Sequence, residues 1–159
     1  MKFQICIAVL VIFLTSCGKT RQCPKENLFP AYIAYADTEI DTVILRRFRL
    51  GSNFVQKLDS IILTPANCQF SRRSDTVILF SIDLTNRIND EYEWQIFNPF
   101  DQKTASISDM KFQIEERRSG GLFSMDPSPC FSPIISYKRD DTTVTTTTQL
   151  GNKYLYIHK

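Results

Sequence analysis

The strongest constraint on the fold of this chain is its hydrophobic patterning, which alternates every two residues and lacks a helical period. Residues 91–96 place Tyr92, Trp94 and Ile96 on one face and charged or polar side chains on the other. Residues 111–115 repeat the alternation. After residue 16, no stretch carries apolar residues at positions i, i+3, i+4 and i+7 over ten or more residues, which is the pattern of an amphipathic helix. The sequence therefore predicts a domain built from β-strands.

Short apolar or alternating runs follow one another at a spacing of roughly ten residues, which is typical of β-sandwiches and barrels. We expect a single antiparallel β-sandwich, immunoglobulin-like or similar, with a barrel as the alternative. Residues 76–82 are the most apolar run and are expected to form a central strand. Residues 83–91 and 106–110 are expected to hold helical turns. The strands are expected at residues 32–35, 42–49, 61–64, 76–82, 91–96, 111–115, 134–137, 142–148 and 154–158.

The amino terminus has the organisation of an export signal. Met1-Lys2 supplies a positive charge, and residues 3–14 are apolar except for Gln4, with Cys6 counted as a small hydrophobic residue. A helix of that length spans about 18 Å, whereas the hydrocarbon core of a bilayer is roughly 30 Å thick. The segment therefore fits a cleavable signal peptide better than a permanent transmembrane helix. We expect residues 1–16 to be removed.

A specific motif lies at the end of the apolar segment. Leu14-Thr15-Ser16-Cys17 resembles the lipobox of bacterial lipoproteins, with a leucine three positions before the cysteine and small residues between them. The resemblance implies cleavage before Cys17, a diacylglyceryl thioether on its sulfur and a fatty acid such as palmitate on its amino group. Two lipid signals are enough for stable membrane anchoring. The alternative is an ordinary secretory signal with an incidental cysteine.

Residues after the lipobox resemble lipoproteins of the Bacteroidota type. Gly18 stands where inner-membrane lipoproteins of some proteobacteria carry aspartate, which implies the outer membrane. Lys19 and Arg21 depart from the acidic tract of lipoproteins exported to the cell surface, which favours a periplasm-facing position with the surface as the alternative. Four triplets also resemble a glycosylation sequon of that phylum, although each also reads as a turn-favouring aspartate that opens a strand: Asp41-Thr42-Val43, Asp59-Ser60-Ile61, Asp75-Thr76-Val77 and Asp141-Thr142-Thr143.

The mature chain is expected to form one domain. Residues 17–28 are polar and mostly basic, as expected of a tether, and residues 29–159 are long enough for a single sandwich. Removal of residues 1–16 takes away one of the 19 basic residues and none of the 17 acidic ones. The resulting near balance lacks the positive excess of a nucleic-acid-binding protein.

Five cysteines occur in the chain, and two of them belong to the export signal and the lipid anchor. Cys23, Cys68 and Cys130 remain in an oxidising compartment, where one disulfide can form. Spacing alone allows three pairings. We favour Cys23–Cys130, because both residues lie in proline-flanked irregular segments, and we expect Cys68 to be a buried thiol. The alternative of a zinc site is disfavoured because no Cys-x-x-Cys pair is present.

The sequence offers no catalytic constellation. The single histidine, His158, lies one residue from the end of the chain, where chains usually fray. There is no glycine-rich phosphate-binding loop. Glu115 and Glu116 are adjacent, so on a strand they would point to opposite faces. We therefore expect no enzyme, no catalytic residues, no cofactor and no metal, although a hydrolase with a convergent acidic site stays as an alternative function.

The remaining function classes are binding modules. We expect a membrane-anchored, non-catalytic binding or scaffolding module that contacts an envelope protein through a sheet edge or the irregular residues 119–133. A carbohydrate-binding accessory lipoprotein is the alternative, and it requires exposed aromatic side chains on one patch. Phe100, Phe123 and Phe131 are the candidates for such ligand contacts.

Overall fold

The computed structural model describes residues 19–74, 77–81, 87–119, 130–146 and 154–159. The chain divides into two compact units, each built from two separate chain segments. The first, which we call the disulfide unit, comprises Met1–Pro24 and Ile114–Ser132. The second, which we call the sandwich unit, comprises Lys25–Gln113 and Pro133–Lys159. Sequence analysis assigned all of residues 29–159 to the sandwich, so the sandwich unit lacks a central part of that range.

The larger sheet of the sandwich unit has six antiparallel strands in the order β11-β10-β8-β7-β3-β4. Strand β4 therefore lies at one edge and β11 at the other. Consecutive strands β3–β4, β7–β8 and β10–β11 are hairpins, as expected for an antiparallel sheet. The strands are β3 (Val43–Arg49), β4 (Lys57–Leu63), β7 (Tyr92–Asn98), β8 (Lys103–Phe112), β10 (Ile134–Arg139) and β11 (Thr142–Thr145).

The smaller sheet has four strands in the order β12-β2-β6-β5. The last strand, β12, runs parallel to β2, and the other neighbours are antiparallel. Strand β6 has a neighbour on each side, as expected for the most apolar run of the sequence. The strands are β2 (Phe29–Ile33), β5 (Gln69–Ser74), β6 (Val77–Ser81) and β12 (Tyr154–His158), and a single 3-10 turn, η1 (Asp37–Glu39), follows β2.

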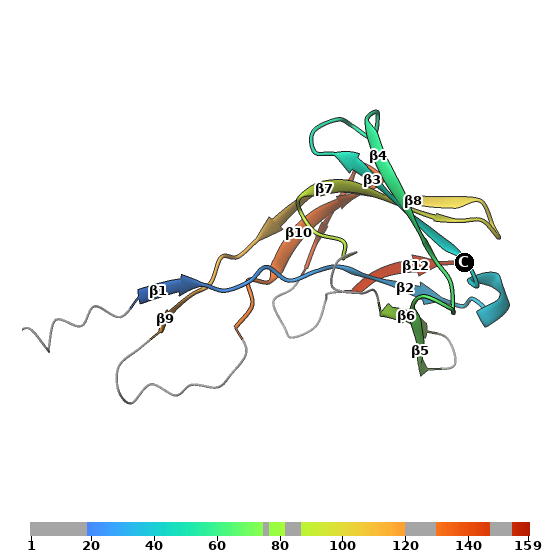
Figure 1. Cartoon of the computed structure of the whole chain (residues 1–159), viewed down its shortest axis with the longest axis horizontal. Coiled ribbons are helices and arrows are strands. Elements are labelled where there is room, and N and C mark those ends of the chain that lie inside the picture. Colours follow the sequence, from blue (N-terminus) through green and yellow to red (C-terminus); the bar gives the residue numbers. More distant parts are fainter. Residues whose placement is uncertain (1–18, 75–76, 82–86, 120–129, 147–153) are drawn as a thin grey trace, which may run out of the picture. The chain divides into compact units, whose positions relative to one another are not determined.

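These two sheets pack face to face, which confirms the predicted β-sandwich (Figure 1). Neither sheet closes into a barrel within the described residues. The strand order is not that of an immunoglobulin domain, whose four-stranded and three-stranded sheets contain no six-stranded arrangement of this kind. The predicted sandwich architecture is thus confirmed, and the order of its strands differs from that of an immunoglobulin domain.

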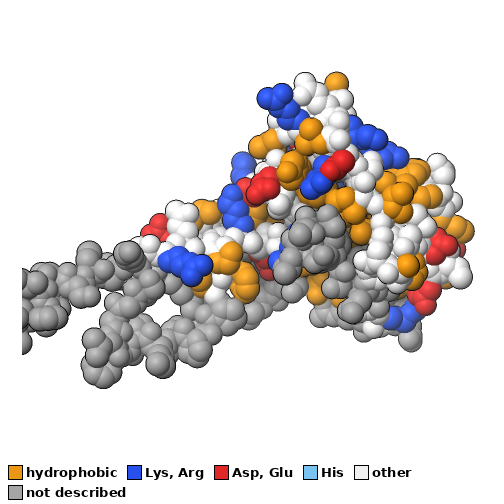
Figure 2. All heavy atoms as spheres, in the orientation of Figure 1, with side chains coloured by type: hydrophobic (Ala, Val, Ile, Leu, Met, Phe, Trp, Pro, Cys, Tyr) orange, Lys and Arg blue, Asp and Glu red, His pale blue; other side chains and the backbone are white. Residues whose placement is uncertain are grey.

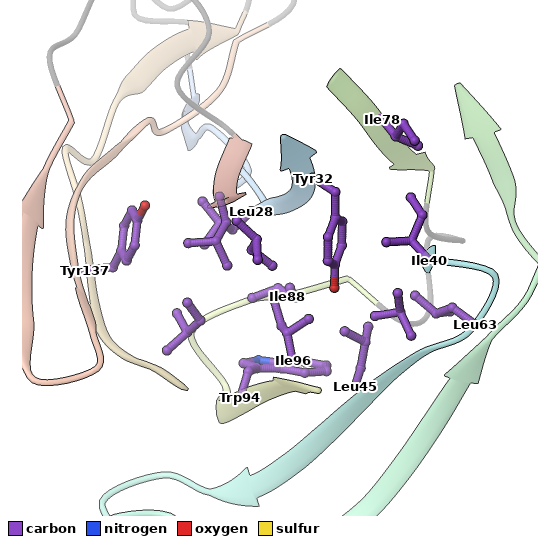
Figure 3. Close-up of a cluster of buried hydrophobic side chains, with 14 of the residues drawn as sticks. Leu28, Tyr32, Ile40, Leu45, Leu63, Ile78, Ile88, Trp94, Ile96 and Tyr137 are labelled. Carbon is purple, nitrogen blue, oxygen red and sulfur yellow. The ribbon is translucent and has the colours of Figure 1, made fainter. Parts of the chain in front are cut away.

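The core lies between the two sheets, where side chains from both inner faces meet (Figure 3). Trp94 and Ile96 come from β7 and Leu45 from β3, and Tyr32 reaches toward them from β2. All four are fully buried, and the indole Nε1 of Trp94 donates a hydrogen bond to the carbonyl oxygen of Asn89 at 3.0 Å. The period-two pattern of residues 91–96 therefore marks an inward face, as the sequence predicted.

Two expectations about local structure are corrected. Residues 106–110 were expected to hold a helical turn but lie within β8. Their apolar signal is weak because Ala105 and Ile107 face the core while Ser106 and Ser108 face outward. Strand β5 was not expected at all, because its sequence is polar and it forms a sheet edge. The other helical turn was expected at residues 83–91. Its first four residues, 83–86, lie outside the described residues.

The disulfide unit contains a two-stranded antiparallel sheet of β1 (Lys19–Gln22) and β9 (Glu116–Ser119). Residues 17–28 were expected to be an irregular tether, but β1 lies within them. Polar composition hid this strand, because no apolar alternation marks it. The signal segment and Cys17 lie outside the described residues.

Candidate functional site

The structure places two of the three predicted disulfide candidates together. The sulfur atoms of Cys23 and Cys130 lie at disulfide distance, with their Cα atoms 5.4 Å apart, which is the pairing that the sequence favoured. Cys68 is a free, half-buried thiol beside the sandwich core. Burial raises the pKa of the Cys68 thiol. A raised pKa keeps the thiol protonated and unreactive at neutral pH.

The three predicted aromatic contacts are distributed over separately described parts of the chain. Phe100 is 58 % exposed on the turn between β7 and β8 of the sandwich unit. Phe131 is 53 % exposed but belongs to the disulfide unit, and Phe123 lies outside the described residues. His158 is exposed at the end of β12. The candidate ligand contacts at Phe100, Phe123 and Phe131 therefore stay a prediction.

A different group of exposed apolar side chains gathers on the β3–β4 hairpin. Leu50 and Val55, in the loop of the hairpin, are 57 % and 80 % exposed. Leu58 and Ile62, on β4, are 55 % and 54 % exposed. Single exposed apolar residues are normal, whereas four within thirteen positions of one hairpin call for an explanation. We call these four residues the β4 surface.

Backbone geometry explains why Leu58 and Ile62 face outward. Ile61 and Leu63 face the core, so residues of the opposite parity face solvent on the outer face of the six-stranded sheet. Ile62 is the register partner of Ile44, which in turn pairs with Phe97 of β7. These three side chains form an apolar row that crosses the outer face at the edge of the sheet.

Basic side chains border this apolar row. The guanidinium carbon of Arg46 lies 4.5 Å from the centroid of the Phe97 ring, a cation–π contact. Arg49 and Lys57 are exposed at the base of the hairpin loop. Figure 2 shows Lys and Arg side chains beside hydrophobic ones over the region where Figure 1 labels β3 and β4. The β4 surface therefore combines apolar contact area with positive charge.

The only acidic residue of β3 and β4 is neutralised within the hairpin. Asp59 receives hydrogen bonds from Nε and Nη2 of Arg47, in a bidentate ion pair. These hydrogen bonds lower the pKa of Asp59 and raise the pKa of Arg47. The Arg47 guanidinium also lies 5.2 Å from the ring centroid of Tyr92. Because this pair is internally balanced, the charge of the hairpin comes from its other basic residues.

A buried carboxylate fixes the loop that presents Leu50 and Val55. Glu93, only 4 % exposed, accepts hydrogen bonds from the backbone N–H groups of Gly51 at 3.0 Å and Phe54 at 2.9 Å. Gly51 has a φ of +73°, a conformation that favours glycine, and Phe54 has a φ of +60°. Glu93 therefore stabilises a loop conformation that the local sequence alone would disfavour.

Strand β4 has no described strand on its outer side. Asn67 caps one end of this edge, since its Nδ2 donates to the carbonyl oxygen of Ile62 at 2.7 Å. A register shift between Arg47 and Phe48 marks a β-bulge at the other end, where Leu58 is the extra residue of β4 between Lys57 and Asp59. Edge strands usually carry such protection against unwanted pairing. The middle of β4, around Ser60, is left as the accessible stretch of sheet edge.

A second polar cluster occupies the end of the sandwich near β12. The hydroxyl of Tyr35 donates a 2.6 Å hydrogen bond to Oδ2 of Asp101, and the backbone N–H of Lys103 donates to Oδ1 at 3.2 Å. Burial alone would raise the pKa of Asp101, but these hydrogen bonds outweigh it and the pKa is lowered. Burial, followed by the hydrogen bond to Asp101, raises the pKa of Tyr35.

The β4 surface was not predicted from the sequence. Residues 61–64 were read as a short apolar strand, and Leu58 was left outside it. The available signal was the period-two spacing of Leu58, Ser60 and Ile62, which indicates a strand with one apolar outward face. Only the register with β3 shows that this face is the outer one.

Comparisons with known proteins leave the site to be judged on its geometry. No protein-family model matches the chain, and neither the curated proteins nor the solved structures yielded a significant match. Among the described residues, no helix has the length and hydrophobicity needed to cross a bilayer. Within the same residues, no three histidine, cysteine or acidic side chains are grouped so as to hold a metal ion.

Proposed function

We propose that this chain is a lipid-anchored lipoprotein of the cell envelope whose sandwich unit is a non-catalytic module that binds a protein partner at the β4 surface. The observation that supports binding is the clustering of Leu50, Val55, Leu58 and Ile62 in solvent on one hairpin. Fold stability does not require these side chains to be apolar, because none of them contributes to the buried core. Exposed apolar clusters bordered by polar residues mark interaction surfaces.

The partner that fits is an extended protein segment carrying both apolar and acidic residues. Its backbone would pair with the edge of β4 near Ser60, as peptides do when they add a strand to a sheet. Its apolar side chains would contact Leu58 and Ile62, and its acidic side chains would face Arg49 and Lys57. Charge complementarity of this kind favours an acidic partner over a second copy of the chain, whose hairpin carries the same positive charge.

Anchoring is proposed at Cys17, with the sandwich held at the outer membrane and facing the periplasm. The lipobox Leu14-Thr15-Ser16-Cys17 supports this part of the proposal. Metabolic labelling with a fatty-acid probe should mark the wild-type protein and should not mark the Cys17→Ala variant. Cell fractionation should find the wild type in the membrane fraction and the variant in the soluble fraction. An unlabelled wild type that fractionates like the variant would contradict anchoring.

Binding at β4 is tested with short synthetic peptides of defined charge. The first alternates valine with glutamate, the second alternates valine with lysine, and the third is the glutamate peptide with a central proline. NMR titration of the full-length protein in mild detergent should show saturable shifts at the amides of Ser60 and Ile62 with the first peptide. The lysine peptide should bind at least tenfold more weakly because of charge repulsion. The proline peptide should also bind at least tenfold more weakly, because proline has no N–H group to donate to the neighbouring strand.

Charged variants locate the binding on the hairpin. Replacing both Leu58→Lys and Ile62→Lys should abolish the peptide shifts, since the apolar contacts are removed from an exposed surface. The matched control is Thr143→Lys, at an exposed position on β11 at the opposite edge of the same sheet. Equal binding of all three peptides would contradict the proposal. So would concentration-dependent shifts at β4 without peptide, which indicate self-association, or shifts caused by anionic vesicles alone.

A further inference from the structure

The sandwich unit contains a cavity of about 140 Å³ that none of the preceding interactions uses. It opens between the two sheets, since its lining comes from β2 and β12 on one side and from β7, β8 and β10 on the other. Tyr32 of β2 reaches across the core toward β7 at this level (Figure 3). The cavity therefore lies within one rigid framework of paired strands.

Hydrogen-bond donors dominate the polar part of this lining. Asn98, only 2 % exposed, accepts a hydrogen bond from the N–H of Phe100 at its Oδ1. Its Nδ2 has no hydrogen-bond partner of good geometry among the described residues, although the Tyr35 hydroxyl is close enough for the amide to offset part of the rise in the pKa of Tyr35 that burial causes. A buried amide nitrogen without a partner is unfavourable, and an acceptor placed in the cavity would satisfy it.

Two cationic side chains complete this polar wall. The ammonium group of Lys103 lies 3.7 Å from the Asp101 carboxylate. Arg139 is held in place by a 2.6 Å hydrogen bond from its Nη1 to the carbonyl oxygen of Tyr156, and its Nε lies 3.5 Å from Oδ2 of Asp140. The cavity lining, in the described part of the chain, contains both of these cations and no carboxylate. Asp101 and Asp140 pair with these two cations from outside the lining, so the wall offers hydrogen-bond donors rather than unpaired charges. An anionic acceptor fits such donors better than a positive group does.

The rest of the wall is apolar and sets the size of an occupant. Ile96, Ala105 and Ile157 line the cavity, and all three are buried. The volume corresponds to about five water molecules at roughly 30 Å³ each. A small molecule with one acidic end and a short hydrocarbon end matches both halves of the lining, whereas a sugar or a nucleotide is too large.

We infer that this cavity binds a short aliphatic carboxylate, whose oxygens accept hydrogen bonds from Asn98 Nδ2 and the side chains of Lys103 and Arg139 while its alkyl group contacts Ile96 and Ile157. The inference is independent of the β4 surface, which lies at the edge strand of the larger sheet. It assigns a small-molecule site to a protein whose proposed partner is a macromolecule.

The test is an NMR titration of the full-length protein with butyrate at neutral pH. Saturable shifts are expected at the side-chain amide of Asn98 and at the backbone amide of Thr104. Butyramide and butanol have nearly the same shape without the charge, so both should bind at least tenfold more weakly. Equal shifts from the neutral compounds, or no saturable shifts from butyrate, would overturn the inference and leave a water-filled cavity.

Variants separate recognition from folding. Lys103→Gln removes one cation from a partly exposed side chain and should weaken butyrate binding about tenfold with little effect on stability. Ala105→Val fills part of the cavity and should prevent binding by butyrate while leaving the positive charges in place. The matched control Lys111→Gln removes an exposed cation near the other end of β8 and should leave butyrate binding unchanged. Equal weakening by the control would indicate a nonspecific charge effect and overturn the site.

Discussion

The buried carboxylate of Glu93 accepts a 2.9 Å hydrogen bond from the backbone N–H of Phe54, thirty-nine positions earlier in the chain. The same carboxylate also receives the N–H of Gly51 and the hydroxyl of Ser52. One side chain on β7 thus holds the loop that carries Leu50 and Val55. The positions of Leu50 and Val55 on the β4 surface therefore depend on the hydrogen bonds that Glu93 accepts from this loop.

Replacing Glu93 should loosen this loop. Hydrogen bonds to a charged acceptor contribute about 1.5–3 kcal/mol each, and Glu93→Ala leaves two backbone N–H groups without an acceptor. We expect the free energy of unfolding, measured in urea by Trp94 fluorescence, to fall by about 2–4 kcal/mol. Glu91→Ala, at an exposed neighbouring position, is the control and should change it by less than about 0.5 kcal/mol. Similar values for the two variants would contradict the role of Glu93.

The hydrogen bond between Tyr35 and Asp101 should make stability depend on pH at both extremes. The pKa of Asp101 is lowered in the folded state, so its contribution is present above its ordinary pKa of about 3.9 and is lost as the pH falls through the folded value. The pKa of Tyr35 is raised, so its contribution is present below about pH 10 and is lost as the pH rises above that value.

The Tyr35→Phe variant tests this pH dependence. It should lower the free energy of unfolding by about 1.5–3 kcal/mol at neutral pH, because the bond to a carboxylate is lost. The loss of stability between pH 10 and 12 should be shallower in the variant than in the wild type. Tyr156→Phe, which changes an exposed tyrosine, is the matched control. Parallel pH profiles for wild type and Tyr35→Phe would rule out the role of this hydrogen bond.

Strands whose side chains face the core in alternation could be predicted from the sequence, whereas the polar edge strand β5 could not. The alternation at residues 91–96 predicted a strand correctly because its inward side chains, such as Trp94, fill the core. Residues 76–82 were predicted as a central strand because they are the most apolar run after the signal segment, and β6 (Val77–Ser81) lies within them. Edge strand β5 was missed because a polar edge strand does not need apolar alternation. The strand at residues 106–110 was missed because Ile107 is the only fully buried side chain among them, which is too little to show a period of two.

The β4 surface and the cavity could not be predicted from the sequence, since each depends on long-range pairing. Ile44, Ile62 and Phe97 form one row only because three strands are aligned in register. Asn98 and Arg139 line one cavity although they are distant in sequence. Proline-flanked positions did point to Cys23 and Cys130, because irregular segments tolerate the geometry of a crosslink, whereas nothing in the composition of residues 19–22 indicated a strand.

The disulfide unit should depend on its crosslink. The two cysteines are separated by 107 positions, and removing a native disulfide from a small domain typically costs about 2–4 kcal/mol. In Cys130→Ser, we expect the amides of β1 and β9 to exchange with deuterium about 30-fold to 1,000-fold faster. Cys68→Ser, the control, should leave these rates unchanged. If a reductant left the amide exchange rates of β1 and β9 in the wild type unchanged, the crosslink would not stabilise this unit.

The claim on which the proposed function depends most directly is the lipid anchor at Cys17. Intact mass spectrometry of the protein isolated from its native membranes tests it in one measurement. The account predicts a chain that begins at Cys17 and carries the added mass of a diacylglyceryl group, with or without a fatty acid on the amino group. A chain that still begins at Met1, or one with an unmodified Cys17, would contradict it.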